Sequence, residues 1–133
     1  MLKVMKKKLL VVIAMLVVAS GIIFTGSTAT KAKDNDVKYL GKYKVTAYCG
    51  CRKCSGKWGA RTASGKKAKQ GRTIAVDKRK IKLGSKVQIN GKTYVAEDVG
   101  GGVKGKHIDV FFKSHKQTKR FGKKTGVKVY KVN

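Results

Sequence analysis

Acidic side chains are the residues of this chain with the clearest capacity for chemistry, because they are rare among many positive charges. The sequence holds 33 Lys and Arg against six Asp and Glu, a formal net charge of +27. After residue 36 only four acids remain, at Asp77, Glu97, Asp98 and Asp109, and each aspartate ends or interrupts a β-like run. In so basic a chain, the few acidic residues call for a specific explanation. We therefore interpret this set as acid/base groups that act on a polyanionic polymer.

A catalytic acid in this basic chain needs protection from the surrounding cations. It must hold its proton near neutral pH, so its pKa has to be raised by burial or by a second carboxylate. The connection 100–106 could fold back and bring Asp98 close to Asp109, and glycosidic cleavage commonly uses two carboxylates in this manner. The ordinary interpretation of a single acid is a turn cap or salt-bridge partner. Asp77 fits that interpretation best, and Glu97, which points away from Asp98, is expected to be solvated.

Short segments with alternating apolar residues are the elements expected to position these acids. The alternation predicts strands at 43–48, 73–77, 86–89, 92–96, 106–112 and 127–132. Asn90-Gly91 separates two of them and favours a type I′ hairpin turn. One short helix is expected at 114–122, where Ser114 and Gln117 have capping-box spacing and Gly122 can end it. The fold class predicted is therefore all-β, a small six-stranded barrel with one short helix.

The N-terminal segment indicates export. Lys6-Lys7-Lys8 precedes a mostly apolar stretch at 9–24, and small residues follow. This pattern predicts a signal peptide over 1–29, with an uncleaved membrane anchor as the alternative. A polar linker is expected at 30–42 and a single domain at 43–133. Either form of export places the domain outside the cytoplasmic membrane, secreted or associated with the cell wall, and argues against nucleic acid as a physiological partner. Membrane association is expected only if the segment stays uncleaved.

A series of short strings resembles a known family. In order they are Thr46-Ala47-Tyr48, Thr62-Ala63-Ser64-Gly65, Ile74-Ala75-Val76-Asp77, Ile81-Lys82-Leu83-Gly84, Ala96-Glu97-Asp98-Val99-Gly100-Gly101, Val103-Lys104-Gly105 and Ile108-Asp109-Val110-Phe111-Phe112. Together they resemble the 3D domain, named for three aspartates. It occurs in stationary-phase survival proteins of Gram-positive bacteria and in the catalytic part of membrane-bound lytic transglycosylase A. The resemblance runs over about 43–132 and implies a double-psi β-barrel that cleaves peptidoglycan glycan strands.

The resemblance also implies roles for individual residues. Asp109 is the implied acid/base, Asp98 supports it, and Asp77 is a weaker member of the catalytic set. The acid would protonate the oxygen between MurNAc and GlcNAc and then take the proton of the MurNAc C6 hydroxyl, which closes a 1,6-anhydro ring. The substrate supplies its own nucleophile, so no cofactor and no second catalytic carboxylate is required. Two departures from the family pattern are Val99, where Thr is frequent, and His107, an extra candidate residue for binding the substrate.

Other side chains are candidates for binding the glycan. Trp58 could stack on a sugar, although it could equally cover the core. Thr62 and Ser64 are placed in the cleft by the resemblance, and their turn propensity offers an ordinary explanation. The Lys and Arg excess favours electrostatic attraction to anionic wall polymers, unless it is simply a solvated surface.

Three cysteines form a tight cluster at Cys49, Cys51 and Cys54. In an exported protein this spacing favours one disulfide, such as Cys49–Cys54, with a free third thiol. The alternative is a zinc site built from three thiolates and a His. Because no second CxxC exists, we expect the disulfide rather than a metal, and a catalytic thiol ranks third.

These observations predict an enzyme that hydrolyses or transfers O-glycosyl bonds of peptidoglycan, acting as a lytic transglycosylase in cell-wall turnover. The alternative is a non-catalytic cationic module that binds the cell wall with the same barrel. A third, weaker hypothesis is a nucleic-acid-binding protein, whose affinity would fall steeply with salt.

Overall fold

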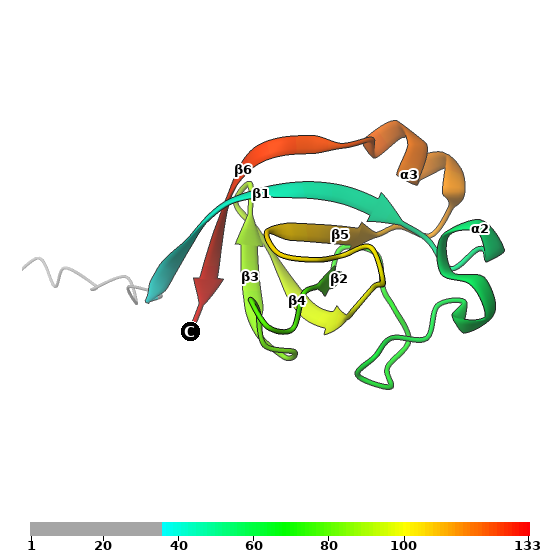
Figure 1. Ribbon diagram of the computed structural model, residues 1–133, viewed down its shortest axis with the longest axis horizontal. Helices are drawn as coiled ribbons and strands as arrows, with labels where there is room; N and C mark the ends of the chain where they lie inside the picture. Colours follow the sequence, from blue (N-terminus) through cyan, green and yellow to red (C-terminus); the bar gives the residue numbers. More distant parts are fainter. Residues whose placement is uncertain (1–35) are drawn as a thin grey trace, which may run out of the picture. The chain divides into compact units, whose positions relative to one another are not determined.

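The computed structural model describes residues 36–133 (Figure 1). The predicted signal or anchor at 1–29 and residues 30–35 lie outside the described residues. The elements are β1 (Val37–Tyr48), α2 (Arg52–Ser55), the 3₁₀ turn η1 (Gly56–Trp58), β2 (Thr73–Val76), β3 (Lys86–Ile89), β4 (Lys92–Asp98), β5 (His107–Phe111), α3 (His115–Phe121) and β6 (Lys124–Val132). In this part of the chain, none of the helices has the length and apolar character needed to cross a membrane.

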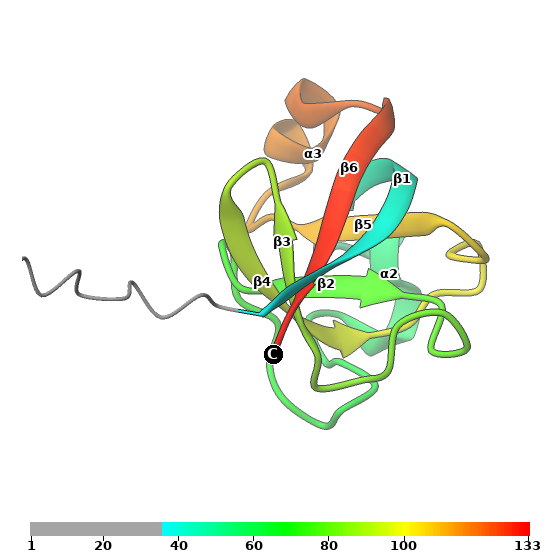
Figure 2. The same ribbon diagram turned by 90° about the vertical axis from the view of Figure 1, so that its left-hand side faces the viewer.

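The strands close into a barrel in the order β1-β5-β2-β4-β3-β6. Two pairs are parallel, β1 with β5 and β2 with β4, and the other four are antiparallel. Figure 2 shows β1 and β6 crossing the face of the barrel side by side, with α3 at one end. The predicted six-stranded, all-β architecture is confirmed. Closure pairs the backbone N–H and C=O groups that the edge strands of so small a sheet would otherwise expose.

The barrel interior is filled by aliphatic side chains from nearly every strand. Ile74, Val76, Val87, Ile108 and Val129 are completely buried and belong to one continuous core. Burying such side chains contributes about 1.5–3 kcal/mol each, which makes this cluster the main source of stability. A second, smaller cluster lies at one barrel end and consists of Tyr48, Ala68, Ala75, Val103 and Phe111.

Strand β1 is longer than its alternating pattern predicts. It begins at Val37 rather than Tyr43 and pairs with β6 from Val37↔Val132 onward. Residues 37–42 of the expected linker therefore belong to the sheet. The alternating pattern is interrupted here by Gly41, which lies at a register shift between β1 and β6. Gly41 has a φ of 113°, a value that residues with a side chain rarely adopt.

The two strongest local signals are confirmed. Asn90 and Gly91 have φ values of 49° and 76° and connect β3 to β4, as the hairpin pattern predicts. Ser114 caps α3 by accepting a hydrogen bond from the Gln117 N–H, and the Gln117 side chain accepts from the Ser114 N–H. Gly122 ends this helix with a φ of 68°. The loop after β1 differs from the prediction because it contains α2 and η1.

Candidate active site

Strand order brings Asp98 and Asp109 to the same end of the barrel. Asp98 ends β4 and Asp109 lies in β5, but the two strands are not neighbours because β2 runs between them. Ala75 of β2 pairs with Asp98 on one side and with Asp109 on the other. The methyl group of Ala75 leaves the space between the two carboxylates open.

A cavity of about 610 Å³ occupies this space and is lined by both carboxylates. One wall comes from β1 and the loop that follows it, through Tyr48, Trp58 and Thr62. The opposite wall comes from the connection after β4, which includes Val99 to Gly101 and Val103. The predicted juxtaposition of Asp98 and Asp109 beside a groove is thus what the structure contains.

Asp109 is the carboxyl group whose surroundings suit a proton carrier. Its Oδ1 accepts a hydrogen bond of 3.0 Å from the Thr46 hydroxyl, its neighbour across the parallel β1–β5 pair. Burial raises the pKa of Asp109, and the nearby charge of Asp98 acts in the same direction. The Thr46 hydrogen bond and the charge of His107 oppose this rise in pKa without cancelling it. The shielding that a general acid requires is therefore present in a strongly basic protein.

His107 reaches Asp109 through Thr46. Its Nε2 lies 2.8 Å from the Thr46 hydroxyl oxygen, and its Nδ1 lies 3.0 Å from the carbonyl oxygen of Gly102. A carbonyl oxygen only accepts, so Nδ1 carries a proton and donates it to Gly102. The result is a chain of hydrogen bonds from the loop before β5 to the candidate acid. The prediction placed His107 in the binding surface, whereas the structure places it behind Thr46.

Asp98 is surrounded by hydrogen-bond donors. Its Oδ2 accepts from the Tyr48 hydroxyl at 2.7 Å, and its Oδ1 accepts from the backbone N–H groups of Ala63 and Val99 at 3.0 and 2.9 Å. Burial, followed by the hydrogen bond to Asp98, raises the pKa of the Tyr48 hydroxyl, so this phenol remains a donor at any physiological pH. Three donors suit a carboxylate that accepts only. Asp98 is thus held in place, and it ties the loop containing Ala63 to the barrel.

The structure does not bring Asp77 to the carboxylate cavity. Asp77 accepts hydrogen bonds from the Arg79 guanidinium, including an ion pair of 2.7 Å, and from the backbone N–H of Gly105 at 2.9 Å. The Arg79 side chain, more than any other group, lowers the pKa of Asp77. Asp77 lines a smaller pocket of about 390 Å³, which shares Val99 to Gly101 and Val103 with the carboxylate cavity but is lined by neither Asp98 nor Asp109. Asp77 thus fits the ordinary interpretation of a turn cap and ion-pair partner.

The prediction for Glu97 was wrong. This residue is buried, with 2% of its surface exposed, instead of solvated. It forms an ion pair of 2.6 Å with Arg72 and accepts a hydrogen bond of 2.8 Å from the Thr73 hydroxyl. A buried carboxylate requires such partners. Both come from β2 or the residue before it, so Glu97 joins β2 to β4 on the side of the sheet opposite Asp98.

The candidate sugar-binding residues differ in their positions. Trp58 lines the cavity and is 65% exposed, so it does not cover the core. Thr62 also lines the cavity, but it is buried and its hydroxyl donates to the carbonyl oxygen of Lys66 at 2.7 Å. Ser64 is exposed beside it, 3.0 Å from the Thr62 hydroxyl, and does not line the cavity.

All three cysteines are free, and the expected disulfide is absent from the structure. The Cys49 and Cys54 sulfur atoms are 3.6 Å apart, whereas a disulfide holds them at about 2.05 Å. His115 lies beside them, with its Nδ1 3.4 Å from the Cys54 sulfur and 3.7 Å from the Cys51 sulfur.

Part of this chain matches a known protein family. Residues 72–133 match the family model described as the 3D domain. The chain carries a 3D domain. Strands β2 to β6, with Asp77, Asp98 and Asp109, all lie inside the matched residues. The resemblance stated from the ordered sequence strings is confirmed.

One curated relative and one solved structure are also similar to this chain. A putative cell wall shaping protein, YabE of Bacillus subtilis, is 43% identical over 93 residues, covering 66% of this chain and 22% of YabE. The chain thus spans about a fifth of that curated relative. A crystal structure of MltA from Escherichia coli, described as having a unique lytic transglycosylase fold, covers 55% of this chain and 27% of MltA at 23% identity, with a TM-score of 0.49.

Two residues of the candidate site were not predicted from the sequence. Thr46 and Tyr48 precede the matched residues and hold Asp109 and Asp98 respectively. They lie two positions apart on β1, so they share one face of that strand. A hydroxyl at both positions was a signal that could have indicated a polar site on this face.

Proposed function

We propose that this protein is an exported enzyme of the bacterial cell wall that cleaves peptidoglycan glycan strands between MurNAc and GlcNAc. We further propose that it acts as a lytic transglycosylase and leaves a 1,6-anhydro-MurNAc end. The observation that carries the proposal is the pair of carboxylates at one cavity, of which Asp109 is shielded and has a raised pKa. The 3D domain and the cell-wall-shaping description of the YabE relative support the same class of substrate.

The two aspartates divide the chemistry because their surroundings differ. Asp109 would hold a proton and give it to the glycosidic oxygen as the bond breaks. Asp98, fixed by three donors, would be oriented toward the positive charge that develops on the sugar ring and would favour it. Asp109, now ionised, would take the proton of the C6 hydroxyl as that oxygen attacks C1. Protons balance over this cycle, and neither water nor a cofactor is consumed.

Thr46 suits the two protonation states of Asp109. While Asp109 is ionised, the Thr46 hydroxyl donates to its Oδ1 at 3.0 Å. When Oδ1 of Asp109 carries a proton, the Thr46 hydroxyl oxygen can accept a hydrogen bond from it. The Thr46 hydroxyl can then donate its own hydrogen bond to Nε2 of His107 at 2.8 Å. Because His107 donates from Nδ1 to Gly102, its Nε2 accepts from Thr46 when the ring is neutral. Beside an ionised Asp109, which takes the Thr46 proton, only the doubly protonated ring can donate from Nε2 to the Thr46 oxygen. We therefore assign His107 and Thr46 to positioning Asp109 rather than to binding sugar.

The cavity has features that suit a glycan. Its volume, about 610 Å³, is in the usual range for small-molecule sites. Trp58 and Val99 present exposed apolar surface at the cavity, which suits stacking on a sugar ring. Arg61 also lines it and could pair with a carboxylate of the lactyl group or peptide stem.

A second candidate function is a non-catalytic module that binds the cell wall. The charge imbalance favours it, since the region after residue 36 holds 27 Lys and Arg against four acids. Attraction to anionic wall polymers would need no catalytic aspartate. The specific prediction that separates the two functions is the role of Asp109.

Digestion of purified sacculi tests the enzyme proposal. We expect the wild-type protein to release muropeptides that end in 1,6-anhydro-MurNAc, detected by mass spectrometry. Replacing Asp109 by Asn should reduce the release by about a hundredfold or more, because a general acid contributes at least that factor. Asp36→Asn makes the same change in charge at an exposed position outside the cavity and should release muropeptides as the wild type does.

Three results would decide against parts of this proposal. Equal release by wild type and Asp109→Asn would remove Asp109 from the mechanism. Products with an ordinary reducing end would identify a hydrolase in place of a transglycosylase. No release by wild type, together with sacculus binding that Asp109→Asn leaves unchanged, would favour the wall-binding module.

A further inference from the structure

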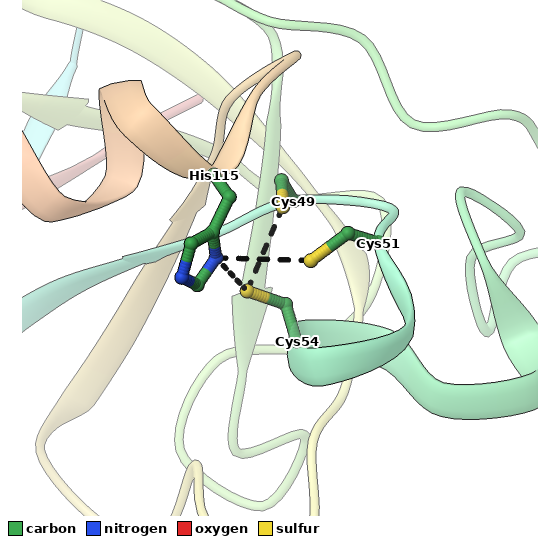
Figure 3. A group of neighbouring side chains, drawn as sticks. All are labelled: Cys49, Cys51, Cys54 and His115. Carbon is green, nitrogen blue, oxygen red and sulfur yellow. Dashed lines mark hydrogen bonds between the residues drawn. The ribbon is translucent and has the colours of Figure 1, made fainter.

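We propose that Cys49, Cys51, Cys54 and His115 bind a structural zinc ion. Their four ligand atoms, three sulfurs and Nδ1 of His115, all lie within 4.8 Å of one another. Figure 3 shows the four side chains converging from the β1 end, the α2 segment and the start of α3. Three thiolates and one imidazole are a recognised ligand set for structural zinc.

The spacing of the ligand atoms fits tetrahedral coordination. With Zn–S bonds of about 2.3 Å and Zn–N bonds of about 2.0–2.1 Å, tetrahedral geometry places sulfur atoms about 3.8 Å apart and sulfur about 3.5 Å from nitrogen. The Cys49 and Cys54 sulfurs are 3.6 Å apart. Nδ1 of His115 lies 3.4 Å from the Cys54 sulfur and 3.7 Å from the Cys51 sulfur. The cluster needs little movement to surround a metal ion.

The backbone around the cluster holds the ligands in this arrangement. Cys54 and Ser55 donate from their N–H groups to the carbonyl oxygen of Cys51 at 3.1 and 2.9 Å, which curls the chain so that Cys51 and Cys54 face the same point. The Ser55 hydroxyl donates to the carbonyl oxygen of Cys49 at 2.6 Å. His115 is the first residue of α3, directly after the capping box at Ser114, so its position is fixed by the helix start.

Charge also favours the metal-bound form. Zinc with three thiolates and a neutral imidazole carries a net charge of −1. Arg52 and Lys53 lie within the cysteine segment, and Lys116 follows the histidine ligand. In so basic a domain an anionic centre is stabilised by its neighbours. A Cys49–Cys54 disulfide, in contrast, would use two of the four ligand atoms and leave only the Cys51 thiol beside His115.

The metal would support one wall of the candidate active site. Helix α2 has only four residues and buries none of them, so it is far too short to be stable by itself. Yet the carboxylate cavity is lined by Cys54 and Ser55 of α2 and by Trp58 of the following turn η1. Four protein ligands leave no open position for catalysis, so the ion would act by fixing this wall and contribute to folding.

Metal content and cobalt substitution test the zinc site on the purified full-length chain in reducing buffer. We expect a single zinc ion per chain by elemental analysis. Replacement with Co²⁺ should give thiolate charge-transfer absorption and the intense visible bands of tetrahedral coordination. His115→Ala and Cys51→Ser should lose this spectrum. His107→Ala, which removes the other histidine of the chain, should keep it.

Thermal unfolding with and without a strong chelator supplies a measurement that does not depend on the variants. Chelation should lower the melting temperature of the wild type and of His107→Ala, and leave that of His115→Ala unchanged. The proposal is overturned if the reduced wild type takes up no zinc or cobalt. It is equally overturned if metal content is the same in His115→Ala, or if the isolated chain holds a disulfide whose reduction restores no metal binding.

Discussion

At the scale of single residues, identical side chains acquire different chemistry from their surroundings. The Asp77 carboxylate pairs with an arginine that holds it ionised, Asp98 accepts from three donors, and Asp109 is half-buried near another acid. Of these three aspartates, only Asp109 combines a place in the cavity with a raised pKa. Residue type alone therefore did not distinguish the candidate acid from the ion-pair partner.

The raised pKa of Asp109 predicts how stability depends on pH. The folded chain holds this proton more tightly than the unfolded chain, so stability from this group is present below the unfolded pKa, about 3.9, and is lost as pH rises through the folded pKa. Asp109→Asn has no ionisable group at this position, so the variant does not lose stability in this way as pH rises. We expect the variant to match or exceed the wild type in free energy of unfolding at neutral pH, and the difference to shrink in acid, measured by urea denaturation across this range.

Asp77→Asn is a control for which we expect the opposite change in the free energy of unfolding at neutral pH. The Arg79 side chain lowers the pKa of Asp77, so its contribution to stability is present above the unfolded pKa and is lost as pH falls through the folded pKa. This variant should be less stable than the wild type at neutral pH. If Asp109→Asn showed the same pattern, Asp109 would be a structural carboxylate and not a protected acid.

At the scale of elements, short local signals determine where strands turn, and pairing determines what they bring together. The β3–β4 hairpin and the α3 cap follow from a few adjacent residues, and both were predictable. The position of β2 between β4 and β5 follows from pairings between distant segments. The cavity exists because this third strand separates the two carboxylates.

The hairpin gives a prediction at this scale. Asn90 is exposed and adopts a φ of 49°, a left-handed conformation that costs about 1–2 kcal/mol for most residues and less for Asn or Gly. Asn90→Ala should therefore lower the free energy of unfolding by about 1 kcal/mol. Asn90→Gly, the matched control, should change it by less. Equal losses in the two variants, measured by urea denaturation, would show that backbone conformation is not what Asn90 contributes.

At the scale of the whole molecule, charge and barrel closure have separate consequences. Closure arranges the strands around the main core and joins β1 to β6 near the two ends of the described region. The excess of Lys and Arg is a long-range property that requires no particular partner side chain. It should therefore control attraction to the wall but not the chemistry at Asp109.

Salt dependence tests this separation. Screening shortens the reach of charges from about 10 Å at 0.1 M salt to about 3 Å at 1 M, so binding to purified sacculi in a pelleting assay should fall steeply over this range. Asp109→Asn should show the same dependence as the wild type. Sacculi stripped of anionic polymers should bind less protein. Binding that salt leaves unchanged would indicate recognition by the cavity in place of surface charge.

The sequence by itself determined the features that depend on near neighbours or on order along the chain. Strand alternation, the Asn90-Gly91 turn, the Ser114 cap and the ordered aspartate strings were sufficient for the barrel and its family. Only the tertiary structure decided what each carboxylate meets. The contacts from Thr46 to Asp109 and from Cys54 to His115 join residues 63 and 61 positions apart. Such contacts arise from barrel closure and crossing strands, and no local pattern carries that information.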